Sequence, residues 1–415
     1  MKKPELLCPA RDLATLKTAV HYGADAVYIG HHTFSLRQGA ANCSFEELEE
    51  GVGYAHTYGK KVYVAANILA HNRDLAAAEA FFERLESIRP DAVIVSDPGL
   101  FMVAKARCPS ADIHISTQTS SMNVGTFRFW QDLGASRVVC ARELTLEEIG
   151  EIHAALPDLE IEAFVHGAMC VSHSGRCLLS SFMAERSANR GACAHPCRWK
   201  YVLMEEKRPG EYMPVEEDAH GTYIMNSRDL CMIGRIPDLI DAGIDSFKIE
   251  GRMKNALYVA VTARAYRMAI DDALKNPALY RSRVGEYLAE IKKCTYRPFT
   301  TGFYDGAPQE SILYDSCDYQ SGAVFLGTVE ALENGEAVLT QKNKFSVGDE
   351  IEVMKPDGRN LSLRVASIRR EDGTAAQSAP HPKERLRVAF EGSGFEETQI
   401  GDVLRSRCEN AAPVI

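Results

Sequence analysis

The stretch KVYVAANILAHNRDLAAAEAFFERLESIRPDAVIVSD, residues 61–97, contains two short apolar runs separated by a longer segment. The first run, KVYVAAN, and the last, AVIVSD, are rich in β-branched residues, which favour strands. The segment between them mixes apolar and polar residues in the pattern of an amphipathic helix. Strands that are continuously apolar and separated by helices are typical of a parallel sheet covered by helices.

The same alternation repeats along the first two-thirds of the chain. Eight runs share it: ELLCPA (5–10), AVYIG (26–30), KVYVAAN (61–67), AVIVSD (92–97), DIHISTQ (112–118), RVVCAR (137–142), IEAFVHG (161–167) and SFKIEG (246–251). We expect Asp12 to cap one intervening helix and Ser44 to begin another with a capping box. Eight such units predict an α/β fold, a TIM-like (β/α)8 barrel. An open doubly wound sheet is the alternative, although no GxGxxG follows the first run.

The 415 residues are expected to form two folded parts. The barrel is predicted over residues 1–300, with a long insertion at about 168–245 after the seventh strand, where a usual loop would be far shorter. Alternating apolar and polar residues then predict a small all-β barrel over 322–408, joined by a linker at 301–321. Within it, Asn334-Gly335 lies between two alternating runs and predicts a β-hairpin.

The charge and the apolar runs of the sequence bear on nucleic-acid binding, secretion and membrane insertion. The net charge of -10 argues against a generally basic nucleic-acid binder, although Arg186, Arg190, Arg198 and Lys200 form a local basic stretch. The first residues lack the apolar core of a secretory signal, and no apolar run is long enough to span a bilayer. We therefore expect a cytoplasmic protein without membrane association.

Polar side chains gather where the predicted strands end. Six share this place: Asn67, Asp97, Gln118, Arg142, His166 and Glu250. In a barrel, the carboxyl ends of the strands form the catalytic face. Each residue could instead cap the next helix, as Asp97 before Pro-Gly suggests, but six together favour an active site. The candidate catalytic residues are Arg142, His166, Glu250 and Arg252, although the sequence assigns no chemical step to any of them.

Four of the twelve cysteines cluster where the insertion begins: Cys170, Cys177, Cys193 and Cys197. In a reducing compartment, structural disulfides are not expected. Zinc sites usually use two closely spaced pairs, whereas iron-sulfur clusters tolerate the wider spacing C-x6-C-x15-C-x3-C. The spacing favours a [4Fe–4S] cluster, with zinc and reduced thiols as alternatives. Cys231 is a reserve ligand, but its amphipathic surroundings are typical of a buried thiol.

EAFVHGAMCVSHSGRCLLS, residues 162–180, resembles the signature of peptidase family U32, Glu-x-Phe-x2-Gly-Ala-Met-Cys-x4-Gly-x-Cys-x-Leu-Ser. ELLCPARD, RGACAHPCRW, HGTYIMNSRDL and SFKIEGR are also similar to this family, so the resemblance covers essentially the whole chain. Within the family it is closest to the tRNA hydroxylation protein P group, which makes 5-hydroxyuridine at the wobble position of tRNA without oxygen. The resemblance implies a TIM-like barrel, a tRNA substrate, prephenate as hydroxyl donor, and a [4Fe–4S] cluster. Its ligands would be Cys170, Cys177, Cys193 and Cys197.

Prephenate is a dicarboxylate and would need cationic partners, for which Arg142, Arg176, Lys248 and Arg252 are candidates. Other functions stay open: a collagenase-like U32 peptidase, a hydroxylase of another RNA or of a small molecule, and a non-catalytic iron-sulfur protein. A homologous partner subunit is also compatible with the resemblance. A peptidase needs an activated nucleophile or a metal-bound water, and the sequence contains no motif for either.

Overall fold

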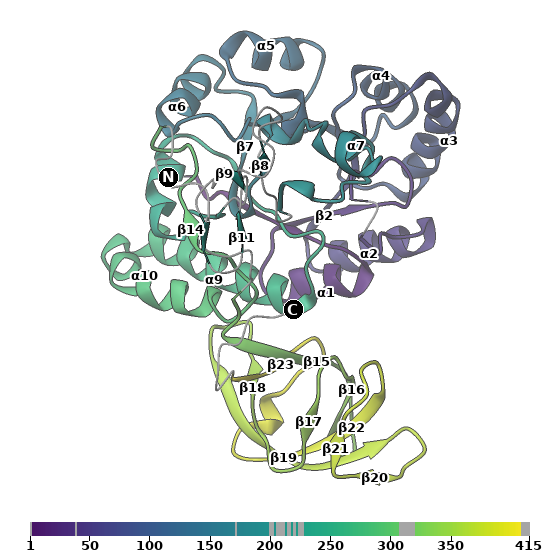
Figure 1. Cartoon of the computed structure of the whole chain (residues 1–415), viewed down its shortest axis with the longest axis vertical. Coiled ribbons are helices and arrows are strands. Elements are labelled where there is room, and N and C mark those ends of the chain that lie inside the picture. Colours follow the sequence, from purple (N-terminus) through teal and green to yellow (C-terminus); the bar gives the residue numbers. More distant parts are fainter. Residues whose placement is uncertain are drawn as a thin grey trace.

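The chain has two folded parts, a barrel of strands surrounded by helices and a smaller all-β region beside it (Figure 1). A computed structural model describes residues 2–37, 40–170, 172–198, 203–204, 212–213, 217–218, 221–222, 228–306 and 320–407. The predicted TIM-like barrel is confirmed, and the alternative of an open doubly wound sheet is wrong. Most of the predicted linker at 301–321 lies outside the described residues.

In the described part of the chain, eight parallel strands close the barrel, because β13 pairs with both β1 and β7. In sheet order they are β1 (Glu5–Pro9), β2 (Ala26–Gly30), β3 (Lys61–Ala66), β4 (Ala92–Val95), β5 (Asp112–Ile115), β6 (Arg137–Val139), β7 (Glu160–Ala168) and β13 (Ser246–Ile249). Their residues are almost all buried, as expected when helices cover the outside and side chains fill the inside. Each predicted run coincides with one of these strands.

Helices surround the strands. They are α1 (Leu13–His21), α2 (Phe45–Thr57), α3 (Asn72–Ile88), α4 (Pro98–Arg107), α5 (Val124–Asp132), α6 (Leu146–Ala155), α8 (Ile236–Asp241), α9 (Ala256–Lys275) and α10 (Pro277–Ile291). The predicted helix starts are confirmed: Asp12 accepts a hydrogen bond from the N–H of Thr15, and Ser44 forms a capping box with Glu47. Among the described residues, no helix has both the length and the apolar character that crossing a bilayer requires.

The insertion between β7 and β13 begins with short helical turns at the end of the barrel. They are η2 (His173–Gly175), α7 (Leu179–Ala184), η3 (Ala188–Arg190) and η4 (Pro196–Arg198). Two short antiparallel strand pairs follow, β8 (Leu203–Met204) with β9 (Tyr212–Met213), and β10 (Glu217–Asp218) with β11 (Gly221–Thr222). The chain then returns through β12 (Asp229–Cys231), which pairs antiparallel with β7 and is extended by β14 (Phe299–Thr300), before η5 (Ile233–Arg235) leads into α8.

The carboxyl-terminal region is a second, antiparallel barrel. Its elements are β15 (Ala323–Glu333), β16 (Glu336–Thr340), β17 (Phe345–Ser346), β18 (Glu350–Met354), β19 (Asn360–Arg370), β20 (Ala375–Ala376), β21 (Ser378–Ala379), β22 (Arg385–Glu391), η6 (Phe395–Glu397) and β23 (Val403–Arg407). The sheet runs β18-β23-β15-β16-β22-β19 and closes because β19 also pairs with β18. Asn334 and Gly335 join β15 to β16 with φ of 52° and 78°, the hairpin that this dipeptide predicts.

The two barrels meet along a polar seam. The hydroxyl of Tyr22, just after α1, donates to the carbonyl of Met354 at 2.7 Å and accepts from the N–H of Val403 at 2.8 Å. Glu290 of α10 accepts a hydrogen bond from Arg405 of β23 at 2.6 Å. Tyr22 and Arg405 are fully or almost fully buried, so their bonds fix the small barrel against the helices of the large one.

Candidate functional site

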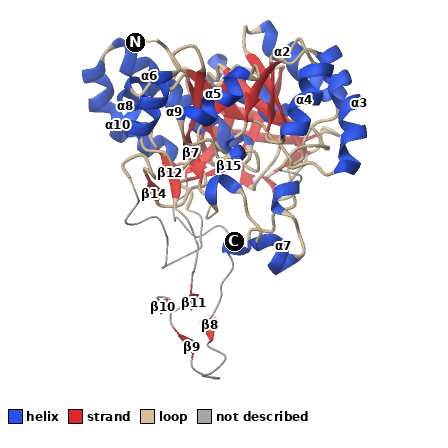
Figure 2. Ribbon diagram, turned by 90° about the horizontal axis from the view of Figure 1, so that it is seen from above, coloured by secondary structure: helices blue, strands red, loops and turns tan. Residues whose placement is uncertain are grey.

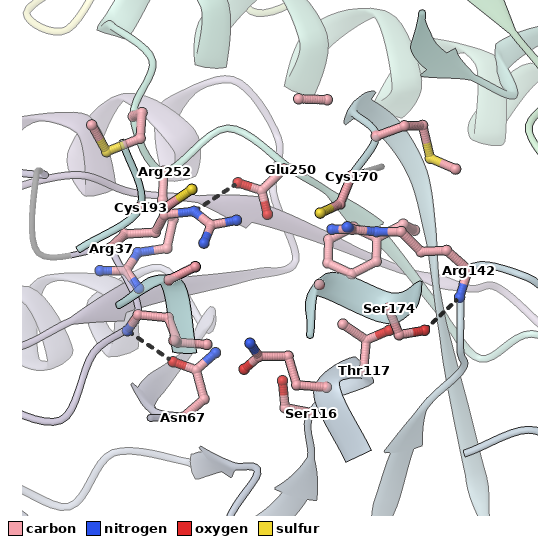
Figure 3. A pocket seen from close by; sticks show the side chains of 18 of the residues that line it. Arg37, Asn67, Ser116, Thr117, Arg142, Cys170, Ser174, Cys193, Glu250 and Arg252 are labelled. Carbon is pink, nitrogen blue, oxygen red and sulfur yellow. Dashed lines mark hydrogen bonds and ion pairs between the residues drawn. The ribbon is translucent and has the colours of Figure 1, made fainter. Parts of the chain in front are cut away.

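A pocket of about 430 Å³ lies at the carboxyl ends of the barrel strands. Residues of six strands line it: Tyr28 of β2, Ala65 of β3, Ile94 of β4, Val139 of β6, Phe164 of β7 and Lys248 of β13. The remaining wall comes from the loops that follow the strands and from the insertion (Figure 3). The pocket therefore occupies the face where (β/α)8 barrels carry their active sites.

All four clustered cysteines line this pocket: Cys170, Cys177, Cys193 and Cys197. None of them is in a disulfide. Four thiols on one pocket match the number and kind of ligand that a [4Fe–4S] cluster takes. Within the described ranges, no three His, Cys, Asp or Glu side chains are gathered to hold a single metal ion.

The loop between Cys170 and Cys177 is tied to the barrel through Ser174. Ser174 has a left-handed φ of 44°, an unfavourable conformation for a residue with a side chain. Its N–H donates to the carboxylate of Glu143 at 2.7 Å, and its hydroxyl donates to the same carboxylate at 2.6 Å. Its hydroxyl oxygen also accepts from the N–H of Arg142 at 3.3 Å. These bonds hold the cysteine loop against the end of β6.

Positive charge dominates the pocket. The described side chains that line it include six cations: Arg37, Arg142, Lys248, Arg252, Lys254 and Arg297. Among the same residues, Glu250 is the one carboxylate. A concave site with this excess of one charge concentrates anions, even on a chain whose net charge is -10.

Two of these guanidinium groups have no carboxylate within hydrogen-bond distance among the described residues. Arg142 lies 4.3 Å from the ring centroid of Phe164, and its guanidinium has no hydrogen-bond acceptor among the described residues. Arg252 is buried and donates to the neutral oxygens of Ser35 and Asn42 at 2.6 and 2.5 Å. Burial lowers the pKa of Arg252 to about 10. Both cations would therefore be stabilised by an anion in the pocket.

Glu250 lies among these cations (Figure 3). Its carboxylate is 3.9 Å from the guanidinium of Arg37. Burial alone would raise the pKa of Glu250, but the charges of Arg37 and Arg142 outweigh it and lower the pKa. Lys248, another lining cation, donates to the buried carboxylate of Glu162 at 2.6 Å. Glu250 is therefore an ionised acceptor on an otherwise cationic wall.

The structure brings together most of the residues that the sequence predicts for the site. Besides the cysteines, the pocket-lining set contains Asn67, Gln118, Arg142, Lys248, Glu250 and Arg252. Asp97 instead caps α4 by accepting from the N–H of Leu100, which is the alternative considered for it. Arg176 donates from Nε to the carbonyl of Gln118 and is not a lining residue. The side chains of Arg198 and Lys200 lie outside the described part of the chain.

The expected place of His166 at the pocket needs correction. Lys248 pairs with Phe164, but the next residue of β13 pairs with His166, so β7 carries one extra residue at this point. The bulge turns His166 outward, where its ring packs against Tyr258 and Tyr266 of α9. Burial lowers the pKa of His166 to about 3. His166 is thus a neutral residue of the packed layer around the barrel and not a lining residue of the pocket.

Cys231 also lies away from the pocket-lining set. Its sulfur is 3.9 Å from the hydroxyl of Tyr266, and burial raises the pKa of its thiol to about 11. The charged or hydrogen-bonding residues of the site that have no counterpart among the sequence-based candidates include Arg37, Glu143, Ser174, Lys254 and Arg297. The length of the segment between β2 and α2, residues 31–44, is a signal that could have drawn attention to Arg37, because long loops on this face carry functional residues.

Comparison with known proteins agrees with the residue pattern. Residues 11–313 match the protein family described as "Peptidase family U32". Residues 322–405 match the family described as "Peptidase family U32 C-terminal domain". The chain is 39% identical to tRNA hydroxylation protein P of Escherichia coli (strain K12), over 92% of each protein. It is 40% identical to tRNA hydroxylation protein P1 of Bacillus subtilis (strain 168), over 92% of this chain and 90% of that protein.

A third relative is the 23S rRNA 5-hydroxycytidine C2501 synthase of Escherichia coli (strain K12), which is 34% identical over 87% of this chain and 52% of that protein. The two family descriptions together span both barrels, and the U32 description covers well over half of the chain. The signature at residues 162–180 lies within the matched part and places two of its cysteines, Cys170 and Cys177, on the pocket. The chain therefore belongs to peptidase family U32.

Proposed function

We propose that this protein hydroxylates the wobble uridine of tRNA to 5-hydroxyuridine without oxygen, using a [4Fe–4S] cluster and prephenate as the hydroxyl donor. One observation carries the proposal: four cysteines and six cationic side chains line the same pocket on the catalytic face of the barrel. The names of the relatives support an RNA substrate, since two are tRNA hydroxylation proteins and one is an RNA 5-hydroxycytidine synthase.

The ligands of the cluster would be Cys170, Cys177, Cys193 and Cys197. With four thiolate ligands, a bound cluster supplies electron transfer or orients a substrate rather than acting through an open iron site. The thiolates make such a cluster anionic. Arg37 is close enough to Cys170 and Cys193 for their charges to raise its pKa, although Glu250 raises it most, and it would offset part of that negative charge.

A donor with two carboxylates and an apolar ring matches the other features of the pocket. Arg142 lies on one side of the pocket and Arg252 on the other, so the two could each pair with a carboxylate (Figure 3). The apolar ring would lie over the floor made by Ile94, Val139 and Phe164. Glu250, ionised and held by cations, is the candidate group to accept a proton from a substrate within this site.

Two other functions are weighed against this one. A hydroxylase of ribosomal RNA would use the same pocket, and one relative carries that name. A peptidase would need an available nucleophile. Ser174 lines the pocket, but it is fully buried, and its hydroxyl donates to Glu143 while accepting from Arg142. It is therefore poorly placed to attack a peptide bond.

The test is mass spectrometry of nucleosides from tRNA of cells that lack this protein and any redundant homologue. We expect 5-hydroxyuridine and its derivatives to disappear, and to return with the wild type and with Cys231→Ala but not with Cys193→Ala. The modification should persist in cells grown without oxygen and should fail when prephenate synthesis is blocked. If the tRNA is unchanged and a modification of ribosomal RNA is lost instead, the protein is a hydroxylase of ribosomal RNA. Unchanged RNA, together with casein cleavage that survives in all four cysteine variants, would overturn hydroxylation altogether.

A further inference from the structure

The insertion exposes a group of large apolar side chains beside the pocket. Leu178, Phe182 and Met183, here called the apolar ridge, are 61%, 80% and 47% exposed. They lie on and immediately before the short helix α7, which projects from the end of the barrel (Figure 2). Leu179, the neighbour of Leu178, lines the pocket, so the ridge begins at the pocket rim. Exposed apolar side chains on a short element at the rim of a pocket are a candidate surface for binding a partner.

The charges around the ridge favour a polyanionic partner. Between residues 172 and 197, the chain carries Arg176, Arg186 and Arg190 against the single acidic residue Glu185. Arg190 is paired with Asp74 at 2.6 Å, but Arg176 and Arg186 are exposed. Together with the cationic pocket, they make this face positive on a chain whose net charge is -10. A partner that is both anionic and rich in flat apolar faces fits such a surface, and single-stranded RNA has both properties.

We propose that the apolar ridge is a stacking platform for unpaired bases of the RNA whose target base enters the pocket. This inference rests on the proposed function, because it assumes an RNA substrate. A base that reacts inside a pocket must leave its stack, and a neighbouring aromatic side chain replaces the lost stacking. Phe182 is the aromatic residue of the ridge, and Leu178 and Met183 would contact the faces or edges of adjacent bases.

The experiment measures binding of the full-length, iron-loaded protein to a fluorescent RNA hairpin with a uridine-containing single-stranded loop. A fully paired RNA duplex of the same length is the second probe. We expect Phe182→Ala to weaken hairpin binding by roughly 10-fold and to leave duplex binding unchanged, because stacking requires unpaired bases. Phe182→Trp should retain hairpin binding. Phe129→Ala, which removes a 54% exposed phenylalanine from α5, is the matched control and should behave as the wild type.

The outcomes separate this inference from the proposed function. If the wild type binds the hairpin and Phe182→Ala binds it equally well, the platform is wrong and RNA hydroxylation stands. If the wild type binds neither probe, the RNA substrate itself is in doubt. If Phe182→Ala instead converts a dimer into a monomer in light scattering, the ridge is a contact between two copies of the chain. A circular dichroism melt equal to that of Phe129→Ala shows that a loss of binding does not come from unfolding.

Discussion

The carboxylate of Glu143 accepts two hydrogen bonds from Ser174, one from its main-chain N–H at 2.7 Å and one from its hydroxyl at 2.6 Å. Ser174 lies midway between Cys170 and Cys177 and is held at a φ of 44°. The left-handed region is unfavourable for serine by roughly 1–2 kcal/mol, so the two hydrogen bonds offset a local strain. The position of the cysteine loop therefore depends on a carboxylate that follows β6, outside the cysteine motif itself.

The first prediction concerns this pair. Glu143→Ala should lower the iron retained per chain, because Ser174 would relax and displace the cysteine loop. Adding Ser174→Gly should restore much of the iron, since glycine adopts a positive φ without strain. Iron content and visible absorbance would be compared with those of Glu151→Ala, which removes an exposed carboxylate from the middle of α6. Equal iron in Glu143→Ala and Glu151→Ala would mean that the pair has no influence on the loop.

The second prediction concerns the ligands. Protein purified without oxygen should be brown and contain about four irons per chain. Single replacement by alanine of Cys170, Cys177, Cys193 or Cys197 should remove most of the iron, whereas Cys231→Ala should keep it, because Cys231 does not line the pocket. Iron analysis and electron paramagnetic resonance of the reduced protein are the measurements. Colourless wild-type protein with one equivalent of zinc would show that the ligand set serves another metal.

The third prediction concerns the anion site. Arg142→Gln should weaken prephenate binding by roughly 10- to 100-fold, because the guanidinium stacked on Phe164 has no other acceptor among the described residues. Calorimetric titration of the iron-loaded protein measures the affinity. Arg128→Gln on α5 changes the net charge equally at an exposed position outside the pocket and is the control. The same affinity in both variants would remove Arg142 from the donor site.

The fourth prediction concerns pH and the seam between the barrels. Burial alone would raise the pKa of Glu290, but the hydrogen bond from Arg405 and the charge of Arg264 lower it from 4.5 to about 2. A carboxylate with a depressed folded-state pKa stabilises the fold above its unfolded pKa and loses this contribution as the pH falls towards 2. Glu290→Gln should therefore reduce the free energy of unfolding near neutral pH by roughly 3 kcal/mol. It should also make the stability depend less on pH between about pH 5 and pH 3.

Urea unfolding of iron-free protein, followed by circular dichroism, measures this effect without interference from acid release of iron. Glu286→Gln is the control, because Glu286 lies on the same helix but is largely exposed and pairs with Arg283 within one turn. If the free energy of unfolding depended on pH identically in the two variants, the hydrogen bonds of Glu290 would make no net contribution to stability.

Features that depend on residues close together in the sequence could be predicted from it. The apolar runs gave the order of the barrel strands, and the Ser44–Glu47 spacing gave a capping box, because both patterns are local. The clustering of Cys170 to Cys197 correctly pointed to one pocket, since all four cysteines follow β7 on the catalytic face. In a (β/α)8 barrel, the segments that follow the strands all lie at the same end, so their location can be predicted once the strands are known.

Other features depend on contacts between residues in irregular segments or far apart in the chain, which no local sequence pattern predicts. The bulge in β7 adds one residue to the alternation and moves His166 from the inside of the barrel to the layer of α9. The bond between Glu143 and Ser174 joins residues 31 positions apart, one in the loop after β6 and the other in the turn η2. Arg252 depends on Ser35 and Asn42, more than 200 positions away. Periodicity carries no information about such partners, because loop conformations are decided by long-range packing.

The Tyr22 hydroxyl bonds to both Met354 and Val403. These bonds limit how the small barrel can be exchanged between relatives. The family descriptions divide the chain near residue 320, which suggests two interchangeable modules. Yet deleting the small barrel would strip Tyr22 of both partners and would uncover Arg264, which is buried against Lys355 and Arg359. In a chimaera of two relatives, the unit of exchange is therefore the small barrel together with the surfaces of α9 and α10 and the end of α1 on which it rests.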